Sequence, residues 1–397
     1  MGIEMKKLLI PNGSFHEIPL IKKAKEMGYY VIASGTASQQ IGYQYADEYV
    51  YGDFSNKELM LDIALDKKIN FICSNCNDFG YLSACYVADK MGLPGHEPYE
   101  TAVTLHHKDK FKKMSKHLGL SSPVAESFSD ARSAKQWIKD VVYPIIIKPT
   151  DLGAGQGITR VDTCEQATAA IDMAIELSKE KMMVIEPFIE GTSHSFNAFI
   201  LNKKVTSYYS DNEYMVFDSY RVSTSASPAD RINEAEHLLI EQTEIVAQEL
   251  NLPDGLLHSQ YIMGKDGKPY ILEITRRMSG DWYAYPQIRA TGIDWIGYSL
   301  KAQLGIDCSD FPKGIKQKGF TGRHCLNGRK IGIIKNISIE EQLKKYVYDS
   351  VLWLNKGYKI NNPKKDYPGI LFFEFPNKKE MIDTILHIED FIHLEYQ

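Results

Sequence analysis

The sequence predicts an α/β protein that begins with a parallel sheet covered by helices on both faces. Short apolar stretches at residues 7–10, 30–33 and 70–73 are predicted strands, and residues 19–27 and 55–66 between them are predicted helices. Strand–helix alternation of this kind is typical of a parallel sheet. Two later features extend the α/β prediction along the chain: a strand that ends in a lysine and a glycine-rich loop, and a hairpin of two strands.

Length, composition and charge agree with a protein of several domains. The chain has 397 residues, enough for two to four folding units at roughly 100 to 200 residues per domain, and 44% of its residues are hydrophobic, which supplies several cores. The formal net charge of −5 gives no basic footprint for nucleic acid. The apolar run after Lys6 and Lys7 ends at Pro11, too early for a signal peptide or a membrane span. We therefore expect a cytoplasmic protein.

Residues 143–158 form the most informative stretch of the chain. An apolar strand ends in Lys148 and continues into a loop that holds Gly153, Gly155 and Gly157. Glycines let backbone N–H groups approach an anion closely, and a nearby ammonium neutralises phosphate charge without demanding a fixed geometry. The loop matches neither the dinucleotide pattern nor the P-loop pattern. Taken alone, it is equally compatible with a phosphate loop and with an ordinary glycine-rich turn.

Two later segments favour the phosphate loop. Residues 182–191 form a predicted buried strand that carries Glu186, where an acceptor and the adjacent backbone suit an adenine amino group. Residues 255–263 and 268–277 are predicted strands, and the Asp266-Gly267 pair between them is a common hairpin signal.

The register of this hairpin predicts a metal site. Gln260 and Glu273 are expected on the same face, where Mg²⁺ that bridges phosphates takes oxygen ligands of this kind. Arg277, two residues beyond Thr275, is expected on the same side, where it meets an anionic transition state.

The order of these features resembles the ATP-grasp superfamily, and within it the carboxylate–amine ligase branch, over residues 5–305. The resemblance implies ATP and Mg²⁺ as cofactors. It implies that Glu273 holds Mg²⁺ with Gln260 at the neighbouring ligand position, and that Lys148 and Arg277 act in catalysis, with the arginine on the transferred phosphoryl or acyl phosphate. The nucleotide contacts that it implies are Lys110, Lys148, the loop glycines Gly153, Gly155 and Gly157, and the adenine-strand residues Glu186, Phe188 and Ile189.

The chain departs from this family at the metal site. Gln260 and Thr275 stand where the family usually has an acidic residue and an asparagine, which leaves Glu273 as the only certain anion. Ser193 and Asn197 stand in a segment where Glu-x-Ser-x-Glu is common, which leaves the ribose contact open. Magnesium held mainly through the nucleotide's own phosphates is compatible with this set, because Mg²⁺ keeps several waters and takes only one or two protein carboxylates. A site that binds ATP without chemistry is the alternative.

The resemblance implies an ATP-grasp fold in three parts. Residues 1–105 are expected to form an N-terminal Rossmann-like domain with a parallel sheet, the pre-ATP-grasp domain. Residues 106–305 are expected to form the ATP-grasp domain, in which residues 123–205 form a mobile lid subdomain. Residues 306–397, where the composition becomes basic and turn-rich, are expected to form a small C-terminal α/β cap.

The substrate site is expected just beyond the hairpin. Asp281, Tyr283 and Arg289 offer an acid for an ammonium, an aromatic wall and an arginine for a carboxylate. The tyrosine is equally compatible with core packing. Polar residues at the carboxyl ends of the first strands are further candidates, with ordinary turns as the equal alternative, namely Asn12, Ser14, Asn75 and Asp78.

The cysteines and histidines carry less information. Cys73 and Cys76 have the spacing of a metal knuckle, but no second pair completes four ligands, so a strand end is favoured over a metal or redox site. His106 and His107 come just before the helix that carries Lys110, and we expect a solvated helix end there rather than a metal site.

The resemblance also implies a function and its partners. We expect an ATP-dependent ligase that activates a small-molecule carboxylate as an acyl phosphate and joins it to an amine, with release of ADP and phosphate. The alternatives are a ligase that uses bicarbonate or formate, and a nucleotide-binding regulatory protein with a degenerate metal site. The expected partners are the carboxylate and amine substrates, without nucleic acid or membrane, and a homodimer is left open.

Overall fold

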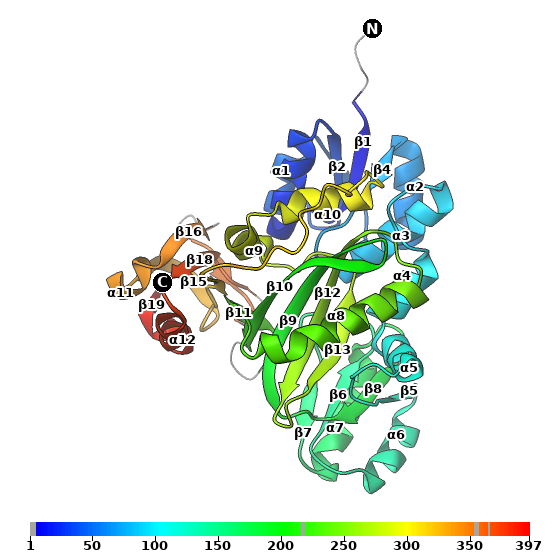
Figure 1. The fold of residues 1–397 in the computed structure, drawn as a ribbon, viewed down its shortest axis with the longest axis vertical. Helices are drawn as coiled ribbons and strands as arrows, with labels where there is room; N and C mark the ends of the chain where they lie inside the picture. Colours follow the sequence, from blue (N-terminus) through cyan, green and yellow to red (C-terminus); the bar gives the residue numbers. More distant parts are fainter. Residues whose placement is uncertain (1–4, 216–218, 353–356, 364–365) are drawn as a thin grey trace.

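The computed structural model describes residues 5–215, 219–352, 357–363 and 366–397. A large central sheet joins three parts: the N-terminal domain in blue and cyan above it, a small lid in blue-green below it, and the C-terminal elements in orange and red to one side (Figure 1). Among the helices of the described ranges, none combines the length and the apolar character that crossing a bilayer requires.

The N-terminal domain contains the predicted parallel sheet. Its strand order is β3-β2-β1-β4, and its pairings are parallel. Leu8, Leu9 and Ile10 of β1 are fully buried, as expected for a central strand that is covered on both faces. The elements are β1 (Lys7–Pro11), η1 (Phe15–Glu17), α1 (Ile18–Glu26), β2 (Tyr30–Gly35), η2 (Ile41–Tyr45), β3 (Glu48–Tyr51), α2 (Lys57–Lys67), β4 (Phe71–Ile72), α3 (Asp78–Met91) and α4 (Tyr99–His106).

An asparagine cap fixes the start of α3, which follows the carboxyl end of β4. Asn77 Oδ1 accepts a hydrogen bond from the Gly80 backbone N–H at 3.1 Å and so satisfies one of the free donors of the first turn. Asp78 is the first residue of this helix, where a negative charge is favoured by the helix dipole. The cap therefore places a carboxylate at the edge of the sheet that faces the central part of the molecule.

The lid is an antiparallel sheet with two helices. Its strand order is β5-β8-β6-β7, and Ile145, Ile147, Ile171 and Ile185 contribute to its own core. The elements are β5 (Glu126–Phe128), α6 (Ala131–Trp137), η3 (Ile138–Asp140), β6 (Ile145–Pro149), β7 (Thr159–Val161), α7 (Cys164–Leu177) and β8 (Met183–Pro187).

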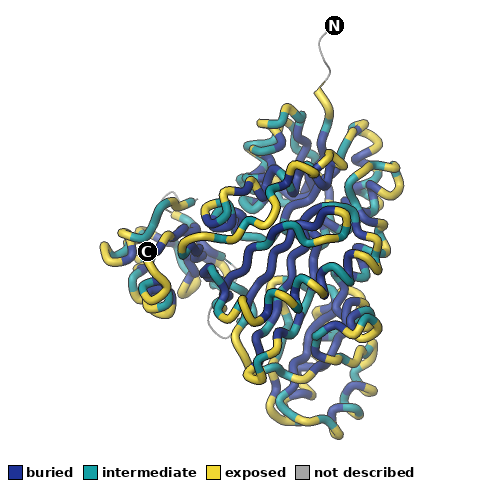
Figure 2. Tube along the Cα trace, in the orientation of Figure 1, coloured by how far each residue is buried: buried dark blue, intermediate teal, exposed yellow. Residues whose placement is uncertain are grey.

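An eight-stranded sheet forms the centre of the molecule, in the order β13-β12-β9-β10-β11-β14-β18-β16. Its central strands are largely buried in Figure 2. The predicted hairpin is present, with Gly267 at a φ of +84° in its turn. The elements of this part are α5 (Lys108–Leu118), β9 (Gly191–Leu201), β10 (Lys204–Met215), β11 (Val222–Ser227), α8 (Ile232–Glu249), β12 (Gly255–Gly264), β13 (Pro269–Thr275), α9 (Ala284–Thr291) and α10 (Trp295–Gln303).

Strand β9 differs from the sequence-based expectation. Residues 191–201 were assigned to the lid, but β9 pairs with β12 on one side and β10 on the other, inside the large sheet. The lid sheet therefore ends with β8. Alternation of side chains along a strand indicates which residues share a face, but it does not identify the sheet that the strand joins.

The C-terminal part is continuous with the central sheet. Strands β14, β18 and β16 extend that sheet beyond β11, and β17-β15-β19 form a separate three-stranded sheet. The expected cap is thus partly an extension of the central sheet. Its elements are β14 (Phe320–Cys325), β15 (Gly332–Ile339), α11 (Glu341–Lys344), β16 (Val347–Leu352), β17 (Lys359–Ile360), β18 (Gly369–Phe375), α12 (Lys378–Leu386), η4 (Ile388–Phe391) and β19 (Ile392–Tyr396).

Candidate active site

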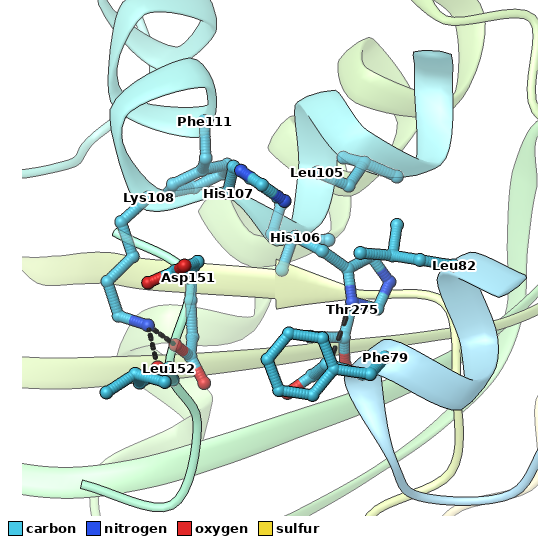
Figure 3. Close-up of a pocket in the computed structure, with 13 residues that line it drawn as sticks. Phe79, Leu82, Leu105, His106, His107, Lys108, Phe111, Asp151, Leu152 and Thr275 are labelled. Carbon is cyan, nitrogen blue, oxygen red and sulfur yellow. Dashed lines mark hydrogen bonds and ion pairs between the residues drawn. The ribbon is translucent and has the colours of Figure 1, made fainter. Parts of the chain in front are cut away.

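Two cavities meet at Lys108 and Glu273, which line both of them. The larger cavity has a volume of about 460 Å³ and lies between the lid and the central sheet. Its walls include Lys108, Lys112, Lys148, Glu186, Phe188, Ile189, Glu213, Gln260 and Glu273. The smaller cavity lies toward the N-terminal domain (Figure 3), and its walls include Asp78, His106, Lys108, Leu152, Glu273 and Thr275.

A buried ion cluster lies on the lid side of the larger cavity. Lys112 Nζ is 2.8 Å from Glu186 Oε2, and Lys148 Nζ contacts Glu186 Oε1. Burial raises the pKa of Glu186, but the two ammonium groups outweigh burial and hold that pKa below its ordinary value. Burial also lowers the pKa of Lys112 to about 8, and Lys148 contributes to this shift against the opposing effect of Glu186. At neutral pH two cations face one anion, so the cavity wall attracts a negatively charged ligand.

Helix α5 turns Lys108 and Lys112 toward the cavities. The Lys108 ammonium donates to the Leu152 carbonyl oxygen at 2.7 Å and lies 3.7 Å from Glu273 Oε2 (Figure 3). Lys110, which the sequence assigned to the nucleotide, is exposed and lines neither of these two cavities. Lys108 and Lys112 belong to the buried face of the helix, and at 3.6 residues per turn position 110 points away from it. The structure therefore favours Lys108 and Lys112 over Lys110 for contact with a nucleotide.

The hairpin brings Gln260 and Glu273 to the same face, as predicted. They are a register pair of β12 and β13, and both line the larger cavity. Gln260 Nε2 donates to Glu213 Oε2 of β10 at 2.8 Å, so a second carboxylate lies beside the pair. Burial raises the pKa of Glu213 to about 8, and the neighbouring Asp211 adds to the rise. Glu213 could not be assigned to this site from the sequence. Strand β10 is connected to the hairpin only through β9, and these strand pairings exist only in the folded sheet.

The glycine loop is closely packed. Gly155 and Gly157 both have a φ of +72°, which favours glycine, and a Cβ at Gly155 would lie 2.5 Å from the backbone carbon of Tyr220. A Cβ at Gly153 would lie 2.7 Å from Asp78 Oδ2. The geometry thus accounts for each glycine. None of the three lines either of the two cavities, so their contact with phosphates stays a prediction.

The strand predicted to read adenine lines the larger cavity through Glu186, Phe188 and Ile189. The guanidinium of Arg160 lies 4.4 Å from the centroid of the Phe188 ring. Because the Glu186 carboxylate is already paired with two lysines, the backbone beside it is better suited than its side chain to an adenine amino group.

Residues 107–281 match the family model of the phosphoribosylglycinamide synthetase ATP-grasp (A) domain. This range contains the residues that line the larger cavity, together with Arg277. The chain contains an ATP-grasp domain.

Relatives of the ATP-grasp region include two kinds of enzyme. The carbamoyl phosphate synthase large chain of Thermoanaerobacter sp. (strain X514) is 25% identical over 229 residues, which are 56% of this chain and 20% of that relative. The D-alanine–D-alanine ligase of Flavobacterium johnsoniae is 24% identical over 254 residues, which cover 58% of this chain and 76% of the ligase. The match thus spans only about a fifth of the length of the carbamoyl phosphate synthase large chain.

Solved structures show that the ATP-grasp fold extends over nearly the whole chain. The L-amino acid ligase from Bacillus licheniformis superposes with a TM-score of 0.83 at 19% identity and covers 99% of each chain. The biotin carboxylase domain of the Hydrogenobacter thermophilus 2-oxoglutarate carboxylase, solved with MgADP, ADP and bicarbonate, superposes with a TM-score of 0.80 at 17% identity. It covers 99% of this chain and 92% of that one.

Arg277 of the ATP-grasp domain is held by Asp78 of the N-terminal domain. Arg277 Nε donates to Asp78 Oδ1 at 2.6 Å, and His106 Nδ1 lies 3.0 Å from the same oxygen. Burial raises the pKa of Asp78, but the Arg277 guanidinium outweighs it and holds that pKa well below its usual range. The prediction of a solvated helix end at His106 and His107 is wrong, because His107 is buried and the His106 side chain is 1% exposed and stacks on Tyr81.

Asp281, a predicted substrate residue, contacts both the N-terminal domain and the C-terminal part. Its carboxylate is 3.4 Å from His16 Nδ1 of the N-terminal domain and 3.7 Å from Arg323 Nη1 of β14. It also accepts a hydrogen bond from the Tyr367 hydroxyl. Burial raises the pKa of Asp281, but Arg323 and His16 outweigh it and keep the pKa below its ordinary value.

The two other predicted substrate residues, Tyr283 and Arg289, contact different groups. The Tyr283 hydroxyl is buried, contacts the Ser195 hydroxyl and accepts from Asn197 Nδ2 at 3.2 Å. Arg289 is exposed and pairs with Glu374. Neither lines either of the two cavities. Asp281 also lines neither cavity, and Arg323 lies 5.4 Å from the centroid of the Tyr283 ring as well as beside Asp281, so contact of these residues with a substrate stays a prediction.

Polar residues of the first domain support η1, the short helix that carries His16. The Ser14 hydroxyl donates to Glu17 Oε2 at 2.6 Å, and Asn75 Nδ2 donates to the His16 carbonyl oxygen at 2.5 Å. Asn12 has a φ of +79° just after β1. Of the four strand-end candidates, Asp78 is the one that contacts Arg277.

The cysteines are free thiols. Cys73 is buried, and burial raises the pKa of the Cys76 thiol, so neither is activated as a nucleophile. Across the described part of the chain, no three histidine, cysteine, aspartate or glutamate side chains are placed to hold a metal ion. A metal at the Glu273 end of the cavity would thus need amide, hydroxyl, water or phosphate oxygens in addition to carboxylates.

Proposed function

We propose that the protein is an ATP-dependent ligase that phosphorylates a small-molecule carboxylate and joins the acyl phosphate to an amine, with release of ADP and phosphate. One observation carries the proposal: Lys108 and Glu273 form a common wall of two cavities. A nucleotide in the larger cavity, with its adenine against Phe188 and its phosphates toward Glu273, would present its terminal phosphate to the smaller one. That arrangement suits transfer between two bound molecules rather than simple nucleotide storage.

The residues at this wall suit Mg²⁺. Gln260 and Glu273 offer oxygen ligands from one hairpin, and the buried Thr275 Oγ1 has no hydrogen-bond partner among the described residues. Mg²⁺ takes oxygen ligands and retains waters, so one or two carboxylates are sufficient. Bound there, the ion would neutralise charge on the β- and γ-phosphates. The MgADP in the 2-oxoglutarate carboxylase structure supports the same cofactor for this chain.

The protein's own groups would act by position and charge. Lys108 and Lys148 would hold the phosphates, and Arg277 would stabilise the charge that develops on the transferred phosphoryl group and on the acyl phosphate. Asp78 orients the Arg277 guanidinium through the 2.6 Å hydrogen bond. Phosphoryl transfer of this kind needs no protein nucleophile, which agrees with the unactivated cysteines.

An amino-acid-like or sugar-acid-like carboxylate is the substrate class that we propose. The neighbourhood of Arg277 contains Arg323, which suits a carboxylate, and Asp281, which suits an ammonium group. The likeness to an L-amino acid ligase supports the amino-acid-like member of this pair. The bicarbonate or formate alternative predicts ADP release with those small anions and none with larger carboxylates.

The experiment that tests this function is ADP release across a panel of carboxylates, each supplied with a mixture of amines. We expect turnover that requires MgATP, one carboxylate class and an amine. ATP binding without turnover under any of these conditions would favour the regulatory alternative.

Lys108→Ala should weaken ATP binding, whereas Lys110→Ala should leave it unchanged. Hydrogen bonds to charged groups contribute about 1.5–3 kcal/mol, so we expect a loss of roughly 10- to 100-fold for Lys108→Ala. Titration calorimetry of both variants measures the difference. Equal losses would show that the helix face assigned to the nucleotide is incorrect.

ATP affinity should fall above about pH 8. Burial lowers the pKa of Lys112 to about 8 in the free protein. A bound phosphate favours the ammonium form and raises that pKa, so binding takes up a proton between the two values, and affinity declines by up to about tenfold per pH unit. Calorimetry from about pH 7 to pH 10 should show this slope in the wild type and in Lys110→Met, and no slope in Lys112→Met. A slope retained in Lys112→Met would assign the titration to another group.

A further inference from the structure

Glu213 is a buried carboxylate that forms no ion pair with a described residue. It is 8% exposed, and its recorded hydrogen bond is the one from Gln260 Nε2 at 2.8 Å. Within the described ranges, no lysine, arginine or histidine nitrogen lies within 4 Å of its oxygens. A buried charge without a partner is costly, so buried carboxylates are normally paired, protonated or bound to a metal.

The topology of the central sheet directs Glu213 to the metal end of the cavity. Strand β9 lies between β12 and β10, and its Ser195 is the register partner of both Gln260 and Asp211. Side chains opposite one another share a face, and Glu213 lies two residues beyond Asp211 on that face. Because the side chain of Ser195 is small, a carboxylate from β10 can approach Gln260 across β9. Glu213, Gln260 and Glu273 therefore line one continuous wall.

We propose that Glu213 supplies the second carboxylate to the Mg²⁺ of the bound nucleotide, from β10, in place of the acidic residue that Gln260 replaces on β12. The proposal rests on the function proposed above. Glu273 would bind the ion from one side of Gln260 and Glu213 from the other. Thr275 Oγ1 lies on the strand of Glu273, is buried without a hydrogen-bond partner in the described part of the chain, and offers a further neutral oxygen. The site then has two carboxylates, as Mg²⁺ sites that also contact nucleotide phosphates commonly do.

If Glu213 is a metal ligand, the neutral Gln260 no longer indicates that the metal site has been lost. A family position without its carboxylate suggests a site that has lost its metal, and hence a protein that binds ATP without chemistry. If the carboxylate is supplied from β10 instead, the charge of the metal site is conserved although its sequence signature is not. Gln260 then serves to hold Glu213 in place through its amide hydrogen bond.

The test measures Mn²⁺ binding to the ADP complex by electron paramagnetic resonance, and the affinity for ADP without metal by calorimetry in EDTA. We expect Glu213→Gln to weaken Mn²⁺ binding by about tenfold or more, with metal-free ADP affinity retained. Glu126→Gln, an exposed glutamate of β5, is the matched control and should change neither quantity. Oxygen-17 line broadening should count one more water on Mn²⁺ in Glu213→Gln than in the wild type.

The double variant Glu213→Gln with Gln260→Glu moves the carboxylate to β12 and should recover most of the Mn²⁺ affinity. This recovery also separates loss of a ligand from misfolding. Unchanged Mn²⁺ affinity in Glu213→Gln, or an unchanged number of bound waters, would overturn the proposal. So would a loss confined to metal-free ADP affinity, which would instead assign Glu213 to the nucleotide itself. If the wild type binds no ADP at all, the proposed function fails, which is a different result.

Discussion

Replacing Glu273 by glutamine should abolish measurable ADP formation while the fold is retained. Glu273 lines both cavities, and its carboxylate lies 3.7 Å from the Lys108 ammonium. Its negative charge is therefore expected to bind the metal and to hold the phosphate-binding lysine in place. Neutralisation of developing charge by a metal ion is worth several kcal/mol. We therefore expect kcat to fall by roughly 10³-fold or more. A coupled assay for ADP at saturating MgATP measures this loss.

Two controls make the Glu273 result specific. Glutamine has nearly the same shape as glutamate, and Glu273 is partly exposed, so the thermal midpoint should change little. Glu126→Gln on the lid should keep wild-type kcat. Full activity in Glu273→Gln would mean that the metal is bound elsewhere in the cavity.

Replacing Arg277 by alanine should lower kcat by roughly 10²- to 10³-fold with a smaller change in KM, because the guanidinium is expected to act on charge that develops only in the transition state. The structure supports this because the Arg277 side chain is only 13% exposed and its guanidinium is already oriented by the hydrogen bond to Asp78. Arg277→Lys keeps the charge but loses the planar fork, so it should recover only part of the rate. Steady-state kinetics of both variants provide the measurement.

Arg289→Ala is the matched control for Arg277. Arg289 lies on the surface and pairs with the half-exposed Glu374, so its loss should leave both constants within about twofold, as for most surface substitutions. A change in KM alone for Arg277→Ala would limit that residue to ground-state binding. A large loss of activity in Arg289→Ala would restore the substrate role that the sequence suggested.

The parts of the site that depend on local pattern could be predicted from the sequence. The turn at Asp266-Gly267 fixes the hairpin, and period-two alternation then puts Gln260 and Glu273 on one face. A strand of isoleucines that ends in Lys148 likewise predicted a lysine at the edge of a buried sheet, where the structure has it. In each case the residues that cooperate are close in the chain or joined by a short turn.

Other residues of the site could not be found from the local pattern that was followed. Some depend on the helical period of 3.6 residues in α5, and others depend on contacts between segments that are distant in the sequence. Helical spacing puts Lys108 and Lys112 on one face of α5 and Lys110 on another. The sequence therefore contained the information needed to prefer Lys108 and Lys112. Glu213 contacts Gln260 only because β9 lies between their strands. Asp78 and Arg277 come from different domains, and no spacing rule connects them. Only the fold shows that Arg289 is at the surface, and its predicted substrate role stays a prediction for the kinetic test above.

Trapping the acyl phosphate is the direct test of whether the protein activates a carboxylate with ATP. Hydroxylamine can replace the unknown amine, so the protein is incubated with MgATP, hydroxylamine and a mixture of amino acids and sugar acids. We expect the wild type to form a carboxylate hydroxamate and ADP in equal amounts, and Glu273→Gln to form neither product. Release of AMP and pyrophosphate in place of ADP, or tight ATP binding with no hydroxamate from any carboxylate, would contradict it.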